Sequence, residues 1–145
     1  MKVLFLDMDN TIAENTTCRD IPFEKGLYLN KRPIKIILLG INLYIRPQMD
    51  KVVILTQVQG GDIGRQEKKI WLKENKIEYD DIVFTHEGRS KTSVILDYCK
   101  EYNIKPSSCL LIDDKKDILQ DADLKGIKTM YPQNLLIEMQ EYMKL

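Results

Sequence analysis

Five short runs of β-branched and aliphatic residues recur along the chain and restrict its fold more than any other feature. They lie at residues 3–6, 52–55, 82–84, 110–112 and 127–130. Their nearly continuous apolar character is typical of strands that are buried on both faces of a parallel sheet. Because segments with helical spacing separate the runs, the pattern predicts an α/β fold: a three-layer, Rossmann-like arrangement with helices on both faces of a five-stranded parallel sheet.

The segments between the runs predict helices with recognisable ends. Pro33 suits the first turn of a helix with apolar residues from Ile34 to Ile45, which ends at Pro47. Ser90 can cap the start of a later helix, and Gly126 can serve as the C-cap of another. The remaining predicted helices cover residues 62–75, 117–125 and 135–142.

The charged helix over residues 62–75 is interpreted as a surface helix. Its apolar stripe is expected to consist of Ile63, Ile70 and Trp71. The lysines at positions 68, 69, 73 and 76 are interpreted as a solvated face, with the glutamates at 67 and 74 as partners.

Length and composition predict one domain over residues 1–145. The chain has 145 residues, and 22 basic residues balance 22 acidic ones, so no global charge attracts it to nucleic acid or to a membrane. Its longest apolar stretch, Ile34–Ile45, is too short to cross a bilayer, and no secretion signal is recognisable. We therefore expect a cytoplasmic protein. Cys18, Cys99 and Cys109 lack metal-ligand spacing and are expected to be buried, reduced thiols.

Polar residues directly follow several of the apolar runs. In open parallel sheets, ligands bind at this place, beyond the carboxyl ends of the strands. Asp7 and Asp9 follow the first run, Thr56 the second, and Asp113 and Asp114 the fourth. Four carboxylates gathered at two strand ends would repel one another unless a cation lay between them. Ligation by oxygen atoms alone suits Mg²⁺ better than zinc or copper.

The arrangement of these residues resembles the haloacid dehalogenase superfamily of phosphatases. The motifs of that family occur here in the family order and match Asp7, Asp9 and Thr11 (DxDxT), then Thr56, Lys91, and the acidic pair Asp113 and Asp114. The resemblance covers most of the chain. It implies a sheet order of 5-4-1-2-3, counting strands along the chain, which seats Asp7 between Thr56 and Asp113.

The resemblance also implies a mechanism. Asp7 would attack phosphorus and form an aspartyl phosphate. Asp9 would act as general acid and then as general base, and its backbone carbonyl would bind the metal. Thr56 and Lys91 would hold the transferred oxygens from the side opposite the metal.

The same resemblance gives a metal site. Mg²⁺ would be held by Asp7 and Asp113, with Asp114 orienting a metal-bound water and Asp117 a candidate for the same outer shell. Each residue also has an ordinary alternative. Asp9 could belong to a simple turn, and Asp114 and Asp117 could form the acidic first turn of a helix. The single histidine, His86, is interpreted as a loop residue.

The segment 12–32 is too short for the full cap domain that many relatives insert there, so the site should be open and the chain should have little or no cap. Three stretches, 23–26, 53–56 and 69–73, resemble the 5'(3')-deoxyribonucleotidase branch and imply a phosphorylated small molecule, such as a nucleoside monophosphate, as substrate. The segment 12–32 is then expected to carry specificity, with Phe23 or Tyr28 against a nucleobase. The alternative is that both aromatic rings pack against the body.

Two other functions remain open at this point. The first is a phosphatase of nucleic-acid ends or phosphoproteins, with Arg89, Lys115 and Lys116 steering an anionic macromolecule into the site. The second is a receiver-like phosphoacceptor module. Receivers resemble this pattern but carry their phosphorylated aspartate after the third strand, where this chain has Thr85 and His86.

Overall fold

The five strands form one parallel sheet in the order β3-β2-β1-β4-β5, which confirms the predicted fold class and order. The structure is a computed structural model that describes residues 1–15, 22–86 and 88–143. The strands are β1 (Val3–Leu6), β2 (Lys51–Gln57), β3 (Asp81–Thr85), β4 (Cys109–Ile112) and β5 (Lys128–Met130). The central position of β1 places the residues that follow it between the ends of β2 and β4.

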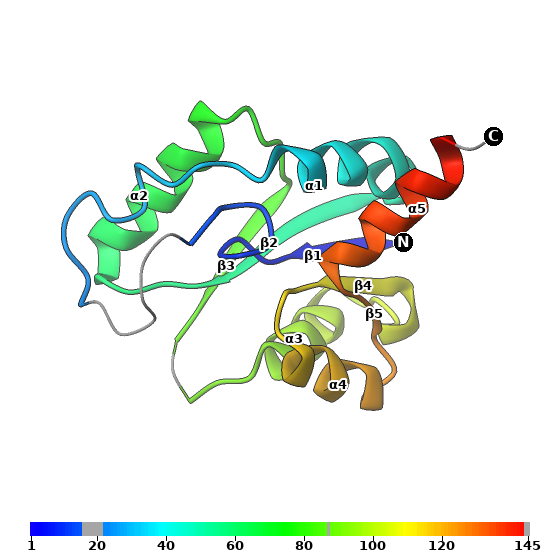
Figure 1. The fold of residues 1–145 in the computed structure, drawn as a ribbon. Helices are drawn as coiled ribbons and strands as arrows, with labels where there is room; N and C mark the ends of the chain where they lie inside the picture. Colours follow the sequence, from blue (N-terminus) through cyan, green and yellow to red (C-terminus); the bar gives the residue numbers. More distant parts are fainter. Residues whose placement is uncertain (16–21, 87, 144–145) are drawn as a thin grey trace.

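Helices cover both faces of this sheet (Figure 1). One face carries α1 (Lys35–Gly40), α2 (Gly61–Glu74) and α5 (Pro132–Met143), and the other carries α3 (Lys91–Tyr102) and α4 (Lys116–Leu124). Alternate residues of β1 pack into the cores on the two faces of the sheet. Leu4 and Leu6 join the core beneath α1, α2 and α5, whereas Val3 and Phe5 join the core beneath α3 and α4. The uninterrupted run of apolar residues in β1 therefore reflects a strand that is buried on both faces.

The two edge strands are less buried than predicted. All residues of β1 are buried, but four of the five residues of β3 are only half-buried, and β5 contains one exposed and two half-buried residues. An edge strand has a neighbouring strand on one side only, and a run of apolar residues does not reveal which strands lie at the edges.

The helix after Pro33 is less regular than predicted. It begins at Lys35, continues after α1 as a π-helical turn over Ile41–Ile45, and ends in a 3₁₀ turn over Arg46–Gln48. Pro33 instead forms a bridge with Ala13, where it closes the base of the 12–32 segment. The 3₁₀ turn contains Pro47, whose fixed φ suits the first positions of such a turn.

Two other predicted helix ends are confirmed. Ser90 Oγ accepts the backbone N–H of Ser93 at the start of α3, at 3.0 Å. Gly126 follows α4 with φ +83°, a conformation that a side chain would strain. The last helix, α5, starts three residues earlier than predicted, at Pro132.

The predicted apolar stripe of α2 is wrong for two of its three members. Ile63 and Ile70 are 50% and 44% exposed, whereas Trp71 is buried. Glu67 and Lys68 are buried beside Trp71 instead, which contradicts the interpretation of these two residues as part of a solvated face. Their burial has a specific cause, because both side chains bind polar groups that other segments bring to them.

Glu67 anchors the segment 12–32, here called the flap, of which residues 12–15 and 22–32 are described. Its carboxylate accepts the backbone N–H groups of Gly26 at 2.8 Å and Tyr28 at 3.1 Å. Nearby, the indole Nε1 of Trp71 donates to the carbonyl of Lys31 at 2.7 Å. The flap is therefore fixed against α2 by backbone hydrogen bonds to two buried side chains.

The structure bears on the cysteines and on the apolar stretches of the chain. Cys99 and Cys109 are buried free thiols with sulfur atoms 3.4 Å apart, as expected, while Cys18 lies outside the described residues. None of the helices in the described ranges is long and apolar enough to cross a membrane.

The anchoring role of Glu67 gives a first prediction. In Glu67→Gln, one acceptor oxygen becomes an NH₂ group facing a backbone N–H, so we expect the variant to lose about 1–3 kcal/mol of stability. Trypsin should also cut faster after Lys25 and Lys31, which can be followed by mass spectrometry. Glu74→Gln, an exposed glutamate of the same helix, is the matched control. Cleavage at equal rates in both variants would contradict the anchor.

Candidate active site

The site is built where β1 ends. The backbone N–H of Asp7 donates to the Ile112 carbonyl at 3.1 Å, so pairing with β4 continues one residue beyond the strand. The chain then turns tightly, with the N–H groups of Thr11 and Ile12 donating to the Met8 carbonyl. This turn returns the Thr11 hydroxyl to the strand end, where it donates to Asp7 Oδ2 at 2.9 Å.

Lys91 joins the ends of β1 and β4. Its ammonium lies 2.7 Å from Asp7 Oδ1 and 2.7 Å from Asp113 Oδ2, and the lysine and both aspartates are buried. Asp113 Oδ1 accepts the backbone N–H of Lys115 at 3.0 Å. Because Lys91 is the first residue of α3, the Ser90 cap fixes the point from which its side chain reaches the strand ends.

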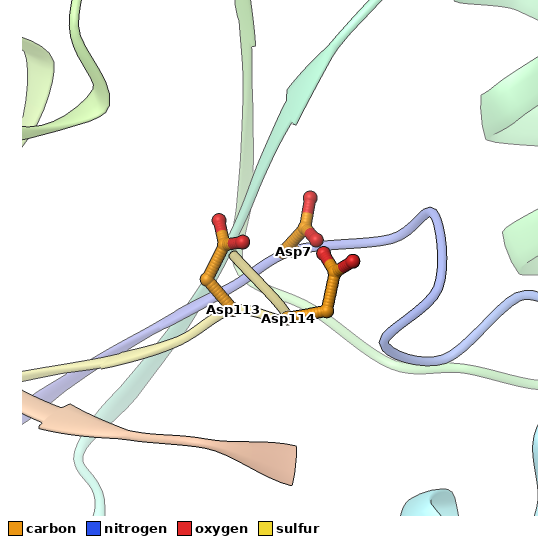
Figure 2. Close-up of side chains that lie close together, drawn as sticks. All are labelled: Asp7, Asp113 and Asp114. Carbon is orange, nitrogen blue, oxygen red and sulfur yellow. The ribbon is translucent and has the colours of Figure 1, made fainter. Parts of the chain in front are cut away.

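Three carboxylates converge at these strand ends (Figure 2). One oxygen each from Asp7, Asp113 and Asp114 lies within 4.8 Å of the others. Among the described residues this is the group of acidic, histidine or cysteine side chains that could hold a metal ion. Three hard oxygen ligands beside a single ammonium suit a divalent cation such as Mg²⁺, which takes carboxylate oxygens and retains water.

The proton affinities of these groups reflect their crowding. Burial raises the pKa of Asp113, and the charge of Asp7 adds to the effect. Burial also raises the pKa of Asp114 to about 7, assisted by a hydrogen bond to Asp7 and by the charges of Asp7 and Asp113. Burial alone would lower the pKa of Lys91, but its two carboxylate partners outweigh burial and raise it. The group therefore holds more negative charge than one ammonium can compensate.

The carboxylate of Asp9 lies in a second, oppositely charged group. It accepts from Lys31 at 2.7 Å through Oδ1 and from Lys68 at 3.0 Å through Oδ2. Burial alone would raise the pKa of Asp9, but the two lysines outweigh burial and lower it. The role of the Asp9 backbone carbonyl as a metal ligand remains a prediction.

Sequence reasoning missed both lysines that contact Asp9, namely Lys31 and Lys68. The Lys68 side chain is 0% exposed, and its ammonium donates to Thr56 Oγ1 at 2.6 Å and to the Gln57 carbonyl at 2.7 Å. Burial lowers the pKa of Lys68, and the charge of Asp9 offsets this decrease only in part. The available signal for Lys68 was its spacing from Trp71, because residues three apart on a helix share a face.

The structure thus brings most of the predicted site residues together in two groups, but it places Lys91 beside the predicted metal ligands Asp7 and Asp113 and not on the side opposite them. Asp7, Lys91, Asp113 and Asp114 form the first group, and Asp9 and Thr56 join Lys68 in the second.

Several other candidates lie outside both groups. Asp117 and His86 are exposed, which fits their ordinary interpretations. The side chain of Arg89 pairs with Asp97.

The flap aromatics fit the packing alternative better than contact with a nucleobase. Tyr28 is only 6% exposed, and its hydroxyl accepts the N–H of Gln59 at 3.0 Å. Phe23 is half-buried 5.7 Å from the Tyr28 ring and fills the space where a side chain at Gly60 would lie. Little of the Tyr28 ring remains available for stacking on a base.

Solved structures with related folds extend these observations. A haloacid dehalogenase-like hydrolase from Streptococcus pneumoniae is 12% identical, with a TM-score of 0.60 and coverage of 89% of this chain and 83% of that one. The phosphatase-containing N-terminal part of a Bacteroides fragilis protein, solved with Mg, is 16% identical, with a TM-score of 0.59 and coverage of 89% and 35%.

A third neighbour belongs to an RNA repair complex, with 16% identity, a TM-score of 0.61 and coverage of 90% of this chain. The present chain spans only 42% of the length of that protein. No known family profile and no curated protein sequence matches the chain. At these identities the likeness concerns the fold, and the chain has the fold of the haloacid dehalogenase hydrolases.

The crowded carboxylates give a second prediction, for the metal-free protein in chelator. The folded-state pKa of Asp114, about 7, exceeds its ordinary value of 3.8, so folding disfavours the ionised form. Stability should therefore fall as the pH rises from about 4 to about 7 and stay lower above that range. Asp114→Asn, which cannot ionise, should raise the Tm at about pH 8 and lose this advantage below about pH 4.

Differential scanning calorimetry measures both effects. Asp121→Asn removes an exposed carboxylate of α4 and should leave the Tm nearly unchanged. A lower Tm for Asp114→Asn than for the wild type at about pH 8 would contradict the inferred repulsion.

Proposed function

We propose that this chain is a phosphatase that hydrolyses phosphomonoesters with Asp7 as the covalent nucleophile. The observation that carries the proposal is the way Asp7 is held at the end of the central strand. Thr11 and Lys91 each bind one of its carboxylate oxygens, and Asp113 and Asp114 lie beside it. A carboxylate fixed in this manner is oriented for attack without having to lose conformational freedom during the reaction.

The proposed reaction has two steps that share one acid–base group. In the first, a carboxylate oxygen of Asp7 forms a bond to phosphorus while the bond from phosphorus to the leaving-group oxygen breaks, giving an aspartyl phosphate. Because Lys31 and Lys68 lower the pKa of Asp9, its carboxylate takes up the proton that a phosphomonoester monoanion brings and passes it to the leaving oxygen. In the second step, Asp9 takes a proton from water, which attacks phosphorus and releases inorganic phosphate and the Asp7 carboxylate. The side chain of Asp9 is 30% exposed, so a leaving group can approach it from solvent.

The donor set supports Mg²⁺ as the cofactor. Asp7 and Asp113 would bind the ion directly together with the Asp9 carbonyl, and Asp114 would do so through water. When bound, the ion would supply positive charge that shields Asp7 from an anionic substrate and offsets charge on the transferred oxygens. The Bacteroides fragilis neighbour was solved with Mg, which favours the same choice.

The lysines have separate proposed tasks. Lys91 holds Asp7 and Asp113 together and compensates one of their charges. Lys68 orients Thr56, whose hydroxyl would bind an oxygen of the transferred phosphoryl group. This arrangement differs from the sequence-based assignment, in which Lys91 and Thr56 acted as a pair, because Thr56 contacts Lys68 instead.

For substrates, we propose phosphorylated small molecules, including nucleoside monophosphates, on the basis of the stretches 23–26, 53–56 and 69–73 that resemble the deoxyribonucleotidase branch. A phosphatase of nucleic-acid ends is the second candidate, favoured by Lys115 and Lys116, which are exposed directly after the acidic pair. A nucleic-acid substrate should show a steep fall of kcat/KM with salt, whereas a small substrate should show little dependence.

The third prediction tests the nucleophile. Asp7→Asn keeps the shape of the side chain but cannot attack phosphorus, so we expect turnover to fall by at least about a thousandfold with the fold intact. Steady-state kinetics with 4-nitrophenyl phosphate, paired with circular dichroism, measures this loss. Asp62→Asn, an exposed acidic residue of α2, is the control. Near-wild-type activity of Asp7→Asn would exclude the mechanism.

The fourth prediction concerns the metal. Asp113→Ala removes a carboxylate expected to bind Mg²⁺, so the concentration giving half-maximal activity should rise about tenfold or more. Chelator should abolish wild-type activity, and added Mg²⁺ should restore it. Activity that persists undiminished in chelator would rule out the proposed metal site.

A further inference from the structure

Lys31 is held in the site differently from the other two lysines. The ammonium of Lys91 bridges two buried carboxylates, and the fully buried Lys68 has three hydrogen-bonding partners. The hydrogen bonds described for the Lys31 ammonium go to one group, Asp9 Oδ1, with the Tyr28 ring 5.2 Å away. An ammonium can donate three hydrogen bonds, so with respect to the described residues Lys31 retains capacity for another acceptor.

The backbone of Lys31 is fixed although its ammonium is not fully engaged. Trp71 Nε1 binds the Lys31 carbonyl at 2.7 Å, and the N–H of Glu14 binds the carbonyl of Arg32 at 2.8 Å. The flap therefore presents the side chain from a constant position over Asp9. A lysine whose backbone is fixed and whose ammonium has donors left is suited to binding a ligand and not only to fastening the flap.

The charges around Asp9 favour an anion at this position. One carboxylate faces the two ammonium groups of Lys31 and Lys68, so this side of the site carries an excess of positive charge. The opposite side, around Asp7, has the reverse imbalance, which a divalent cation would correct. Because Lys68 is committed to Thr56 and Gln57, the excess charge that remains accessible is that of Lys31, whose side chain is 10% exposed.

We propose that Lys31 forms an anion subsite for the leaving group, and that the preferred substrates are phosphomonoesters whose leaving group carries a second anionic group close to the ester oxygen. This inference rests on the proposed function, in which Asp9 protonates the leaving oxygen. The leaving group must then pass within reach of the Asp9 carboxylate, and Lys31 contacts that same carboxylate at 2.7 Å. A carboxylate or a second phosphate on the leaving group would meet the Lys31 ammonium there.

Matched substrate pairs test the subsite. Phosphoglycolate and ethyl phosphate differ by a carboxylate on the leaving group, and adenosine 3',5'-bisphosphate and adenosine 5'-monophosphate differ by a second phosphate. For the wild type we expect kcat/KM to favour the anionic member of at least one pair, and the pair that shows the preference identifies the anion. In Lys31→Met that preference should fall roughly tenfold or more, mainly through KM. Lys31→Arg should retain most of it.

Control measurements separate this inference from the proposed function. Lys25→Met removes an exposed lysine of the same flap and should leave both ratios unchanged. If the wild type hydrolyses none of the four substrates and no activated aryl phosphate, the proposed function itself fails. If it hydrolyses them without preferring either anionic member, or if Lys31→Met lowers both members of each pair equally with a lower Tm, Lys31 only fastens the flap and the subsite is refuted.

Discussion

The buried carboxylates at the ends of β1 and β4, and the ammonium of Lys91 between them, are the interaction on which the site depends. Asp7 and Asp113 directly follow adjacent strands and are buried, and a buried carboxylate is costly without a partner. Lys91 compensates one charge and holds both side chains in position, while Asp114 adds a third carboxylate. The remaining negative charge makes this place suited to a cation. A stability cost in the metal-free protein is the expected consequence of such an arrangement.

The second group of charges depends on the first through the turn after β1. That turn returns Thr11 to Asp7 and leaves Asp9 on the side of α2, where Lys68 and the flap lysine meet it. The two sides of the site therefore differ in sign within a few residues of chain. A phosphomonoester placed between them would have its nucleophile on the negative side and its leaving group on the positive side, which is the polarity that the proposed reaction requires.

The sequence was sufficient to predict the sheet and to single out residues that lie together at the ends of β1 and β4. Central strands buried on both faces leave a near-continuous apolar run, and polar residues such as Asp7 and Asp113 stand out where those runs end. The Ser90 cap was also readable, because capping is a local interaction. These features depend on neighbouring residues or on the position of a residue relative to a strand.

The buried polar face of α2 could not be read in the same way. In the sequence, Glu67 and Lys68 look like members of a solvated charged helix. They are buried because other segments supply their hydrogen-bond partners. The partners of Glu67 lie in the flap, 39 and 41 residues earlier, and those of Lys68 lie at the end of β2, 11 and 12 residues earlier. The π-helical turn after α1 likewise has no local signal in its apolar sequence. Contacts between distant segments decide such features, and hydrophobic periodicity does not report them.

Covalent trapping tests the central claim most directly. The protein would be quenched in acid during turnover of a phosphomonoester with Mg²⁺, reduced with borohydride, and digested for mass spectrometry. Borohydride converts an aspartyl phosphate to homoserine, so the account predicts homoserine at position 7, formed only when substrate is present. Trapping of another residue, or turnover without any trapped acyl phosphate, would contradict the assignment of Asp7 as the nucleophile.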